Sequence, residues 1–331
     1  MKMKLRKIIA LSVTAVMALG IFAGCDAIGG GTTAAAEYPS RGVVVVVPFT
    51  AGGGTDLVAR GISQAASELD FFPNGIAVEN RTGAGGAIGL SSGATAAPDG
   101  YTITTLTVES VTLPHMGTGV EFNADSFIPI IMLNEAVSVI SVNADSHFET
   151  LEQLIEESRT GTVRVGNSGV GAIWHLAAAA LAEESGADFV HVPFEGAADA
   201  ITSLMGNHIE AIPVSYSEVS SHVAAGTLRV LAVLGPNRIP SISDVPTAGE
   251  LGYDVQVSAW RGMAVPAGTP DHIVDYLYNA FSTAAASEYF QEFMTNSNLT
   301  IDIMGPAEYG ERVRRDGALF GELIENLELA H

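Results

Sequence analysis

Short apolar runs alternate with longer segments of helical periodicity over most of the chain. The first run, residues 43–47, is five valines that end at Pro48, which is typical of a strand buried on both faces of a sheet. A glycine turn at residues 52–54 and a helix follow, and Thr55 or Asp56 is expected to cap that helix. The order of strand, loop and helix recurs, so the pattern predicts an α/β fold with mostly parallel strands.

Later segments repeat this order. Further strands are predicted at residues 76–79, 101–107, 163–166, 189–192, 209–215 and 229–234. One helix is predicted to follow the loop through residues 81–83 and to end at residue 97. Further helices are predicted at residues 151–155, 172–185, 197–205 and 218–225. The C-terminus is also predicted to be helical, with an apolar stripe of Leu319, Phe320, Leu323, Ile324 and Leu327.

Two longer apolar stretches, residues 127–142 and 255–265, are predicted to cross between two lobes. At roughly 100–200 residues per domain, the length of the chain also favours two units. We therefore expect residues 38–138 together with 262–331 to form lobe 1, and residues 139–261 to form lobe 2. Each lobe is expected to be a mostly parallel sheet flanked by helices, and two crossover strands join the lobes.

The first 24 residues have the pattern of an export signal. Four basic residues precede an apolar run at residues 8–23, which is shorter than the ~20 residues that a spanning helix needs. Cys25 follows small residues and is the only cysteine of the chain, so we expect a lipidated cysteine and a flexible tether at residues 25–37. The alternative is an unmodified cysteine in a signal peptide that is cut nearby. Either way the protein is expected outside the cytoplasm.

Composition excludes several kinds of chemistry. The 331 residues are 47% hydrophobic and 16% charged, with a net charge of −22. Without the export signal, 11 basic residues face 37 acidic ones, a net charge of −26, and all 11 are arginines. The absence of lysine from that part excludes a P-loop lysine, a Schiff-base lysine and a Ser-Lys dyad. So acidic a surface repels phosphate backbones, and nucleic acid is not an expected partner.

Two glycine bends have similar surroundings: residues 48–56 (PFTAGGGTD) and residues 166–171 (GNSGVG). Each lies between a predicted buried strand and a helix N-terminus. Backbone N–H groups there could hold an anion, helped by the ~+0.5 charge equivalent of the helix dipole. If the bends face one cleft, they could hold a carboxylate without any positive side chain. Either bend alone would be an ordinary strand-to-helix connection.

Other motifs are incomplete. Trp174 and Ile88 stand where two dinucleotide-binding fingerprints would need glycine. The hydrolase elbow G-x-S-x-G is almost met around Ser168, but Val170 takes the last position. The eight histidines have no metal-ligand spacing, so no metal is expected. Since these motifs are incomplete, no cofactor and no catalytic residue are expected either.

Four further residues are candidates with two interpretations each. Asp56 and Asp199 lie near predicted helix starts, so each is either a cap or part of a binding site. His175 follows the second bend and either touches a ligand or packs at a lobe surface. Arg261 either pairs with a ligand carboxylate or anchors an ion pair between the lobes.

Nine segments, in order from Tyr38 to near the C-terminus, together resemble the extracytoplasmic solute-binding proteins of tripartite tricarboxylate transporters, the Bug family. They are YPSR (38–41), PFTAGGGTD (48–56), ENRTGAGGAIG (79–89), APDGYT (97–102), GNSGVGAIWHLAA (166–178), HVPFEGAADAITSLMGNHIE (191–210), AGTLRVLAV (225–233), DVPTAGELGYD (244–254) and SAWRGMAVPAGTP (258–270).

The resemblance implies a two-lobed, type II periplasmic-binding-protein fold and a non-enzymatic receptor. Its ligand would be a di- or tricarboxylate or a related organic acid, its partner a membrane permease driven by an ion gradient, and its state a monomer. Carried over to this sequence, the ligand-binding residues are Phe49, Gly53, Gly54, Thr55 and Asp56 in the first bend, Ser168, Gly169 and Gly171 in the second, His175 in the following helix, and Asp199.

Two alternatives remain at this stage. One is an α/β serine hydrolase that acts through Ser168, and the other is a ligand-sensing adaptor for a membrane kinase. For the receptor, binding is expected to persist at high salt. Valine at Gly53 or Gly169 is expected to cut affinity at least tenfold while the fold survives.

Overall fold

The computed structural model describes residues 38–117, 119–326 and 329. The predicted export signal, Cys25 and the tether lie outside the described residues, so those predictions are not tested. No helix in residues 38–117 or 119–326 has the length and the apolar character that a membrane crossing requires.

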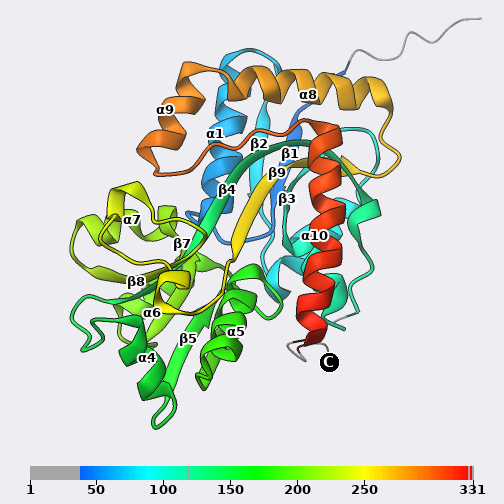
Figure 1. The fold of residues 1–331 in the computed structure, drawn as a ribbon. Helices are drawn as coiled ribbons and strands as arrows, with labels where there is room; N and C mark the ends of the chain where they lie inside the picture. Colours follow the sequence, from blue (N-terminus) through cyan, green and yellow to red (C-terminus); the bar gives the residue numbers. More distant parts are fainter. Residues whose placement is uncertain (1–37, 118, 327–328, 330–331) are drawn as a thin grey trace, which may run out of the picture. The chain divides into compact units, whose positions relative to one another are not determined.

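The described strands form one hydrogen-bonded path (Figure 1). Its order is β2 (Ile76–Asn80), β1 (Val43–Val47), β3 (Thr102–Thr107), β9 (Ser258–Pro266), β4 (Phe127–Asn143), β7 (Ala211–Ser215), β5 (Val163–Asn167) and β6 (Phe189–Pro193), with β8 (Leu228–Leu234) beside β4. The buried valines of β1 are central in its half of the sheet, as their β-branched run predicts.

Strand direction differs between the short and the long strands. β1 pairs parallel with β2 and β3, and β5 pairs parallel with β6 and β7, as the alternation of strands and helices predicts. The long strands β4 and β9 pair antiparallel with their neighbours, which makes the whole sheet mixed.

β4 takes the place of the first predicted crossing. From Phe127 to Val137 it pairs with β9, and from Ser138 onward it pairs with β7 and β8. β4 therefore joins the strands on the β9 side of the sheet to the strands on the β7 side. The lobe boundaries at residues 138 and 261 stay a prediction.

Helices cover the strands around two apolar cores. One core packs α1 (Gly54–Glu68), α8 (Asp271–Ala285) and α9 (Glu288–Asn296) against β1, β3 and the first half of β4. The other involves α2 (Ala87–Ala94), α3 (Glu109–Thr112), α4 (Leu151–Ser158), α5 (Ile173–Ser185), α6 (Ala197–Met205), α7 (Tyr216–Ala224) and α10 (Pro306–Asn326). Figure 1 shows α10 running beside β4, with which it is in contact.

The described residues also contain short 3₁₀ segments: η1 (Ala84–Gly86), η2 (Leu113–His115), η3 (Ala124–Ser126), η4 (Pro240–Ile242) and η5 (Gly249–Leu251).

Three expectations need correction. The N-cap of α1 is Gly53, with no side-chain cap, instead of Thr55 or Asp56. α2 ends at Ala94, three residues early. On α10, Phe320 and Ile324 are buried, but Leu319 is 59% exposed and does not belong to the apolar stripe.

Candidate functional site

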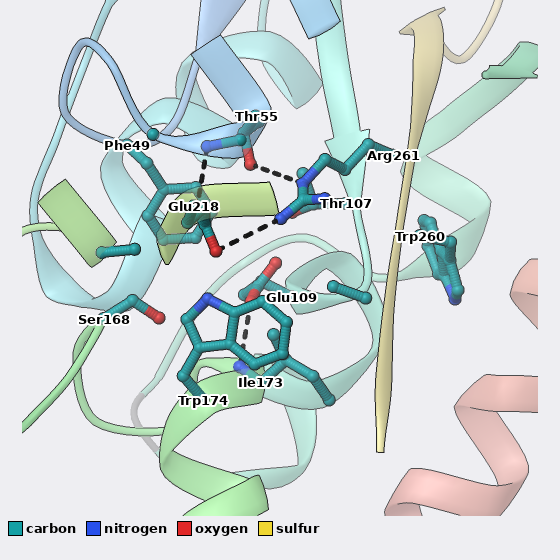
Figure 2. Close-up of a pocket in the computed structure, with 14 residues that line it drawn as sticks. Phe49, Thr55, Thr107, Glu109, Ser168, Ile173, Trp174, Glu218, Trp260 and Arg261 are labelled. Atoms are coloured by element: carbon teal, nitrogen blue, oxygen red, sulfur yellow. Dashed lines mark hydrogen bonds and ion pairs between the residues drawn. The ribbon is translucent and has the colours of Figure 1, made fainter. Parts of the chain in front are cut away.

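A cavity of about 20 Å³ is bordered by residues of both glycine bends. Figure 2 shows its wall. Five predicted ligand-binding residues belong to that wall, namely Phe49, Gly53, Gly54 and Thr55 of the first bend and Ser168 of the second. The rest of the wall consists of Thr107, Glu109, Ile173, Trp174, Ala197, Glu218, Ala259, Trp260 and Arg261.

The first bend is shaped by Asp56, which is not on the wall. Its carboxylate accepts hydrogen bonds from Gly52 N at 2.9 Å and from Asn80 Nδ2 at 2.9 Å, and it pairs with Arg60 Nε at 2.9 Å. Burial raises the pKa of the Asp56 carboxyl, but these hydrogen bonds outweigh burial and hold the pKa below its ordinary value. Asp56 therefore holds the loop that carries Gly53 and Gly54.

The N-terminus of α1 binds a carboxylate that belongs to the chain itself. Gly54 N donates to Oε1 of Glu218 at 2.9 Å (Figure 2). The other oxygen, Oε2, accepts from Ser215 N at 3.0 Å, which is part of the capping box of α7, and also from Ser215 Oγ at 2.6 Å. Glu218 thus caps two helices at once, its own and the helix that follows the first glycine bend.

The second bend is differently oriented. Ser168 is buried on the cavity wall, whereas Gly169 and Gly171 face other parts of the chain. A Cβ added at Gly169 would lie 2.5 Å from Cα of Gly85, and one added at Gly171 would lie 2.7 Å from Cγ of Met116. The structure therefore does not place these two predicted residues on the wall.

The N-terminus of α5, after the second bend, is also capped by a carboxylate. Ile173 N donates to Oε1 of Glu109 at 2.9 Å. Glu109 is 2% exposed, and burial raises the pKa of its carboxyl despite the hydrogen bond from Ile173 and the charge of Arg261. Both helix N-termini that were predicted to bind an anion therefore hold an internal carboxylate.

Arg261 lies at the centre of β9, and its cross-strand neighbours are Thr107 and Asn134. Its Nη1 donates to Asn134 Oδ1 at 2.7 Å and its Nε to Thr55 Oγ1 at 3.2 Å, while Nη2 is 3.9 Å from Oε2 of Glu218. Burial lowers the pKa of the guanidinium, and the charges of Glu218 and Glu109 oppose that shift. Arginine stays charged under such conditions, so a buried cation borders the cavity.

Two other predicted site residues also lie off the wall. His175 Nδ1 accepts from Gly171 N at 3.2 Å, and its ring is edge-on to the His191 ring, with centroids 4.8 Å apart. Asp199 is exposed in the first turn of α6, although Ala197 of that turn belongs to the wall. Of the candidates, Asp56, Gly169, Gly171, His175 and Asp199 are thus placed outside the cavity.

Sequence reasoning missed Glu109, Glu218 and Trp174 as wall residues. Glu109 follows closely after the predicted strand at residues 101–107, where the carboxyl end of a parallel strand commonly carries site residues. Ser215 and Glu218 have the spacing of a capping box. Neither pattern reveals that these carboxylates reach helices far away in the chain. Within the described residues, no group of three histidine, cysteine, aspartate or glutamate side chains is placed to hold a metal ion.

Comparison with known proteins gives consistent matches over nearly the whole described part. A family model for the tripartite tricarboxylate transporter family receptor matches residues 58–329. A UPF0065 protein encoded in the tcbD-tcbE intergenic region of a Pseudomonas species is 33% identical over 261 residues, which cover 76% of this chain and 75% of that protein.

Two solved structures are similar as well. MatC from Rhodopseudomonas palustris, solved with bound malate, has a TM-score of 0.82 at 26% identity, over 87% of this chain and 100% of that one. Another R. palustris protein, solved with adipate, has a TM-score of 0.83 at 25% identity, over 89% of this chain and 99% of that one.

Proposed function

This chain belongs to the tripartite tricarboxylate transporter receptor family, and from that premise we propose that it captures a small carboxylated organic solute in the cavity described above. The observation that carries the proposal is the joint wall: Gly53 and Gly54 of the first bend and Ser168 of the second border one cavity with the buried Arg261. Malate and adipate in the two similar structures support a carboxylate as the ligand.

Two donors on the wall suit a ligand carboxylate. Nη2 of Arg261 is 3.9 Å from Glu218, beyond hydrogen-bond distance, so it can bond to a ligand oxygen. The Ser168 hydroxyl is the second donor, from the opposite bend. The binding mode that we propose therefore combines one buried cation with a hydroxyl. This differs from the expectation that backbone amides alone bind the carboxylate, because the amides of Gly54 and Ile173 already donate to Glu218 and Glu109.

Binding requires the walls of the cavity to move. About 20 Å³ is room for about one water molecule, so a dicarboxylate has access only when the walls separate. The two caps, Gly54 with Glu218 and Ile173 with Glu109, each join a segment of proposed lobe 1 to a segment of proposed lobe 2. Opening would break both caps, and closure around the solute would be a hinge motion.

The remaining parts of the proposal rest on the family and on the sequence. The receptor delivers its solute to the ion-gradient-driven membrane permease of a tripartite tricarboxylate transporter and performs no reaction of its own. It acts as an extracytoplasmic monomer, anchored to the membrane by a lipid on Cys25.

A thermal-shift and calorimetric screen of the purified protein tests the binding function. Succinate, malate, adipate and citrate are compared with their uncharged methyl esters. At least one acid is expected to raise Tm in a concentration-dependent way, with about 2.7 kcal/mol of stabilisation at one hundred times its Kd, and its ester is not.

Equal shifts by acids and esters, or no shift with any acid, would refute the proposal. Release of methanol from the esters that is lost in Ser168→Ala would support a hydrolase instead.

A further inference from the structure

The charged residues that border the cavity do not balance. Among the wall residues of the described chain, Arg261 is the one cation, and Glu109 and Glu218 are acids. All three are buried: Glu109 and Arg261 are 2% exposed as residues, and the Glu218 side chain is 4% exposed. Buried charges need partners of opposite sign, so the cavity has one carboxylate in excess of its cations.

In the closed arrangement, hydrogen bonds hold both carboxylates in place. Glu218 accepts from Gly54 N and from the backbone and hydroxyl of Ser215, and Glu109 accepts from Ile173 N. A ligand carboxylate cannot take over these amides without leaving a glutamate unpaired in a closed space. A ligand with two carboxylates would bring two more negative charges to a wall with a single guanidinium. A ligand that carries one positive group would meet the excess carboxylate instead.

The apolar part of the wall also suits a cation. The Phe49 ring and the Trp174 indole border the same cavity as the two glutamates (Figure 2). Phe49 is 8% exposed and Trp174 is 3% exposed, so neither ring is freely solvated. An ammonium group over such a ring face is attracted by the ring quadrupole, most strongly where water is excluded.

We propose, resting on the carboxylate-binding function above, that the preferred solute is zwitterionic: it carries an ammonium group as well as a carboxylate. The carboxylate binds at Arg261 Nη2 and the Ser168 hydroxyl, and the ammonium group binds between Glu218 and Glu109 beside the two aromatic rings. Such a solute leaves the net charge of the cavity unchanged, whereas a dicarboxylate of the same length makes it more negative by two.

Matched pairs of solutes test the proposal by calorimetry on the purified protein. Each pair has the same spacing and differs only in one end group: succinate with β-alanine, glutarate with γ-aminobutyrate, and adipate with δ-aminovalerate. We expect the amino acid of the best-bound pair to bind at least tenfold more tightly than its dicarboxylate. If the dicarboxylates bind equally well or better, the zwitterion proposal is overturned and the carboxylate-binding function stands. If no member of any pair and no acid of the screen above binds, the carboxylate-binding function itself is in error.

Substitution of one glutamate then identifies the side chain that binds the ammonium group. Glu218→Gln keeps an oxygen for Gly54 N but removes the charge, so affinity for the amino acid is expected to fall at least tenfold while affinity for the dicarboxylate holds or rises. Glu152→Gln on α4, an exposed site, is the charge-matched control and leaves both affinities unchanged. An equal loss for both ligands in a folded Glu218→Gln protein would overturn the proposal. Glu109→Gln serves as the second variant if Glu218→Gln does not fold.

Discussion

At the first glycine bend the backbone faces the cavity, whereas at the second bend most of the backbone faces other parts of the protein. Gly54 lies against the Arg261 guanidinium and donates its N–H to Glu218. Gly169 has φ +115° and lies against Gly85, and Gly171 has φ +77° and lies against Met116. Glycine is therefore required for space beside a charged cluster in the first bend, and for a left-handed backbone and close packing in the second.

The difference predicts that the same substitution has unlike consequences in the two bends. Gly169→Val is expected to lower the free energy of unfolding by about 3 kcal/mol or more, because it adds a strained φ of +115° and a contact of 2.5 Å with the Gly85 backbone. This changes the expectation from sequence that the fold survives at both bends. Urea denaturation measures the effect. The corresponding variant Gly53→Val has φ outside the left-handed region and nearest atoms at 3.6 Å, so it should unfold close to wild type. Equal losses in the two variants would remove the distinction.

The carboxylates beside the two bends are expected to respond oppositely to pH. Hydrogen bonds hold the pKa of Asp56 below its ordinary value, so its stabilisation is present at neutral pH and is lost as pH falls through the lowered pKa. Burial raises the pKa of Glu109, so the folded state loses stability as pH rises from about 4.5, the ordinary value, towards the raised pKa. Asp56→Asn should therefore cost about 2 kcal/mol near pH 7, because it breaks several buried hydrogen bonds, and Glu109→Gln should stabilise the protein there.

Urea titrations of both variants and the wild type from about pH 3 to about pH 8 measure these differences. Both differences should shrink as pH falls, because the Asp56 carboxylate begins to take up a proton in the folded state and Glu109 becomes protonated in both the folded and the unfolded states. A Glu109→Gln protein that is less stable than wild type at neutral pH would contradict the argument, since it would mean that the ionised carboxylate is well compensated.

Affinity should distinguish two neighbouring glycines of the first bend. A Cβ at Gly54 would lie 2.9 Å from Arg261 Nη2, the donor that we assign to the ligand carboxylate, and one at Gly53 would have its nearest neighbours at 3.6 Å. Gly54→Ala is therefore expected to weaken ligand binding about tenfold, about 1.4 kcal/mol, and Gly53→Ala much less. Calorimetry with the best ligand of the screen measures both. If Gly53→Ala is the more harmful change, the Arg261 side chain is not the critical donor.

Much of this arrangement can be predicted from the sequence, and there is a physical reason why the rest cannot. The valine run and the glycine bends predict β1, α1, β5 and α5 closely, because local hydrophobic periodicity and turn chemistry determine such elements. Glu109 and Glu218 were not predicted as wall residues, because their partners are distant in the chain. Ile173 lies 64 residues from Glu109, and Gly54 lies 164 residues from Glu218. The roles of Gly169 and Gly171 likewise depend on Gly85 and Met116, which only tertiary packing brings there.

The smallest expected effect is that of salt on ligand affinity. It distinguishes the buried charges beside the first bend from the charges of the acidic surface. The chain carries a net charge of −22, yet most of that charge is exposed to solvent and is screened within about 10 Å at 0.1 M salt and about 3 Å at 1 M. Arg261 and Glu218 are buried against each other, so added ions reach their interaction poorly. The Kd of the best ligand should therefore change by less than about threefold over that salt range. A site built from exposed arginines such as Arg60, whose side chain is 47% exposed, would weaken steadily with salt. Such a steady loss would show that the ligand carboxylate binds outside the Arg261 cavity.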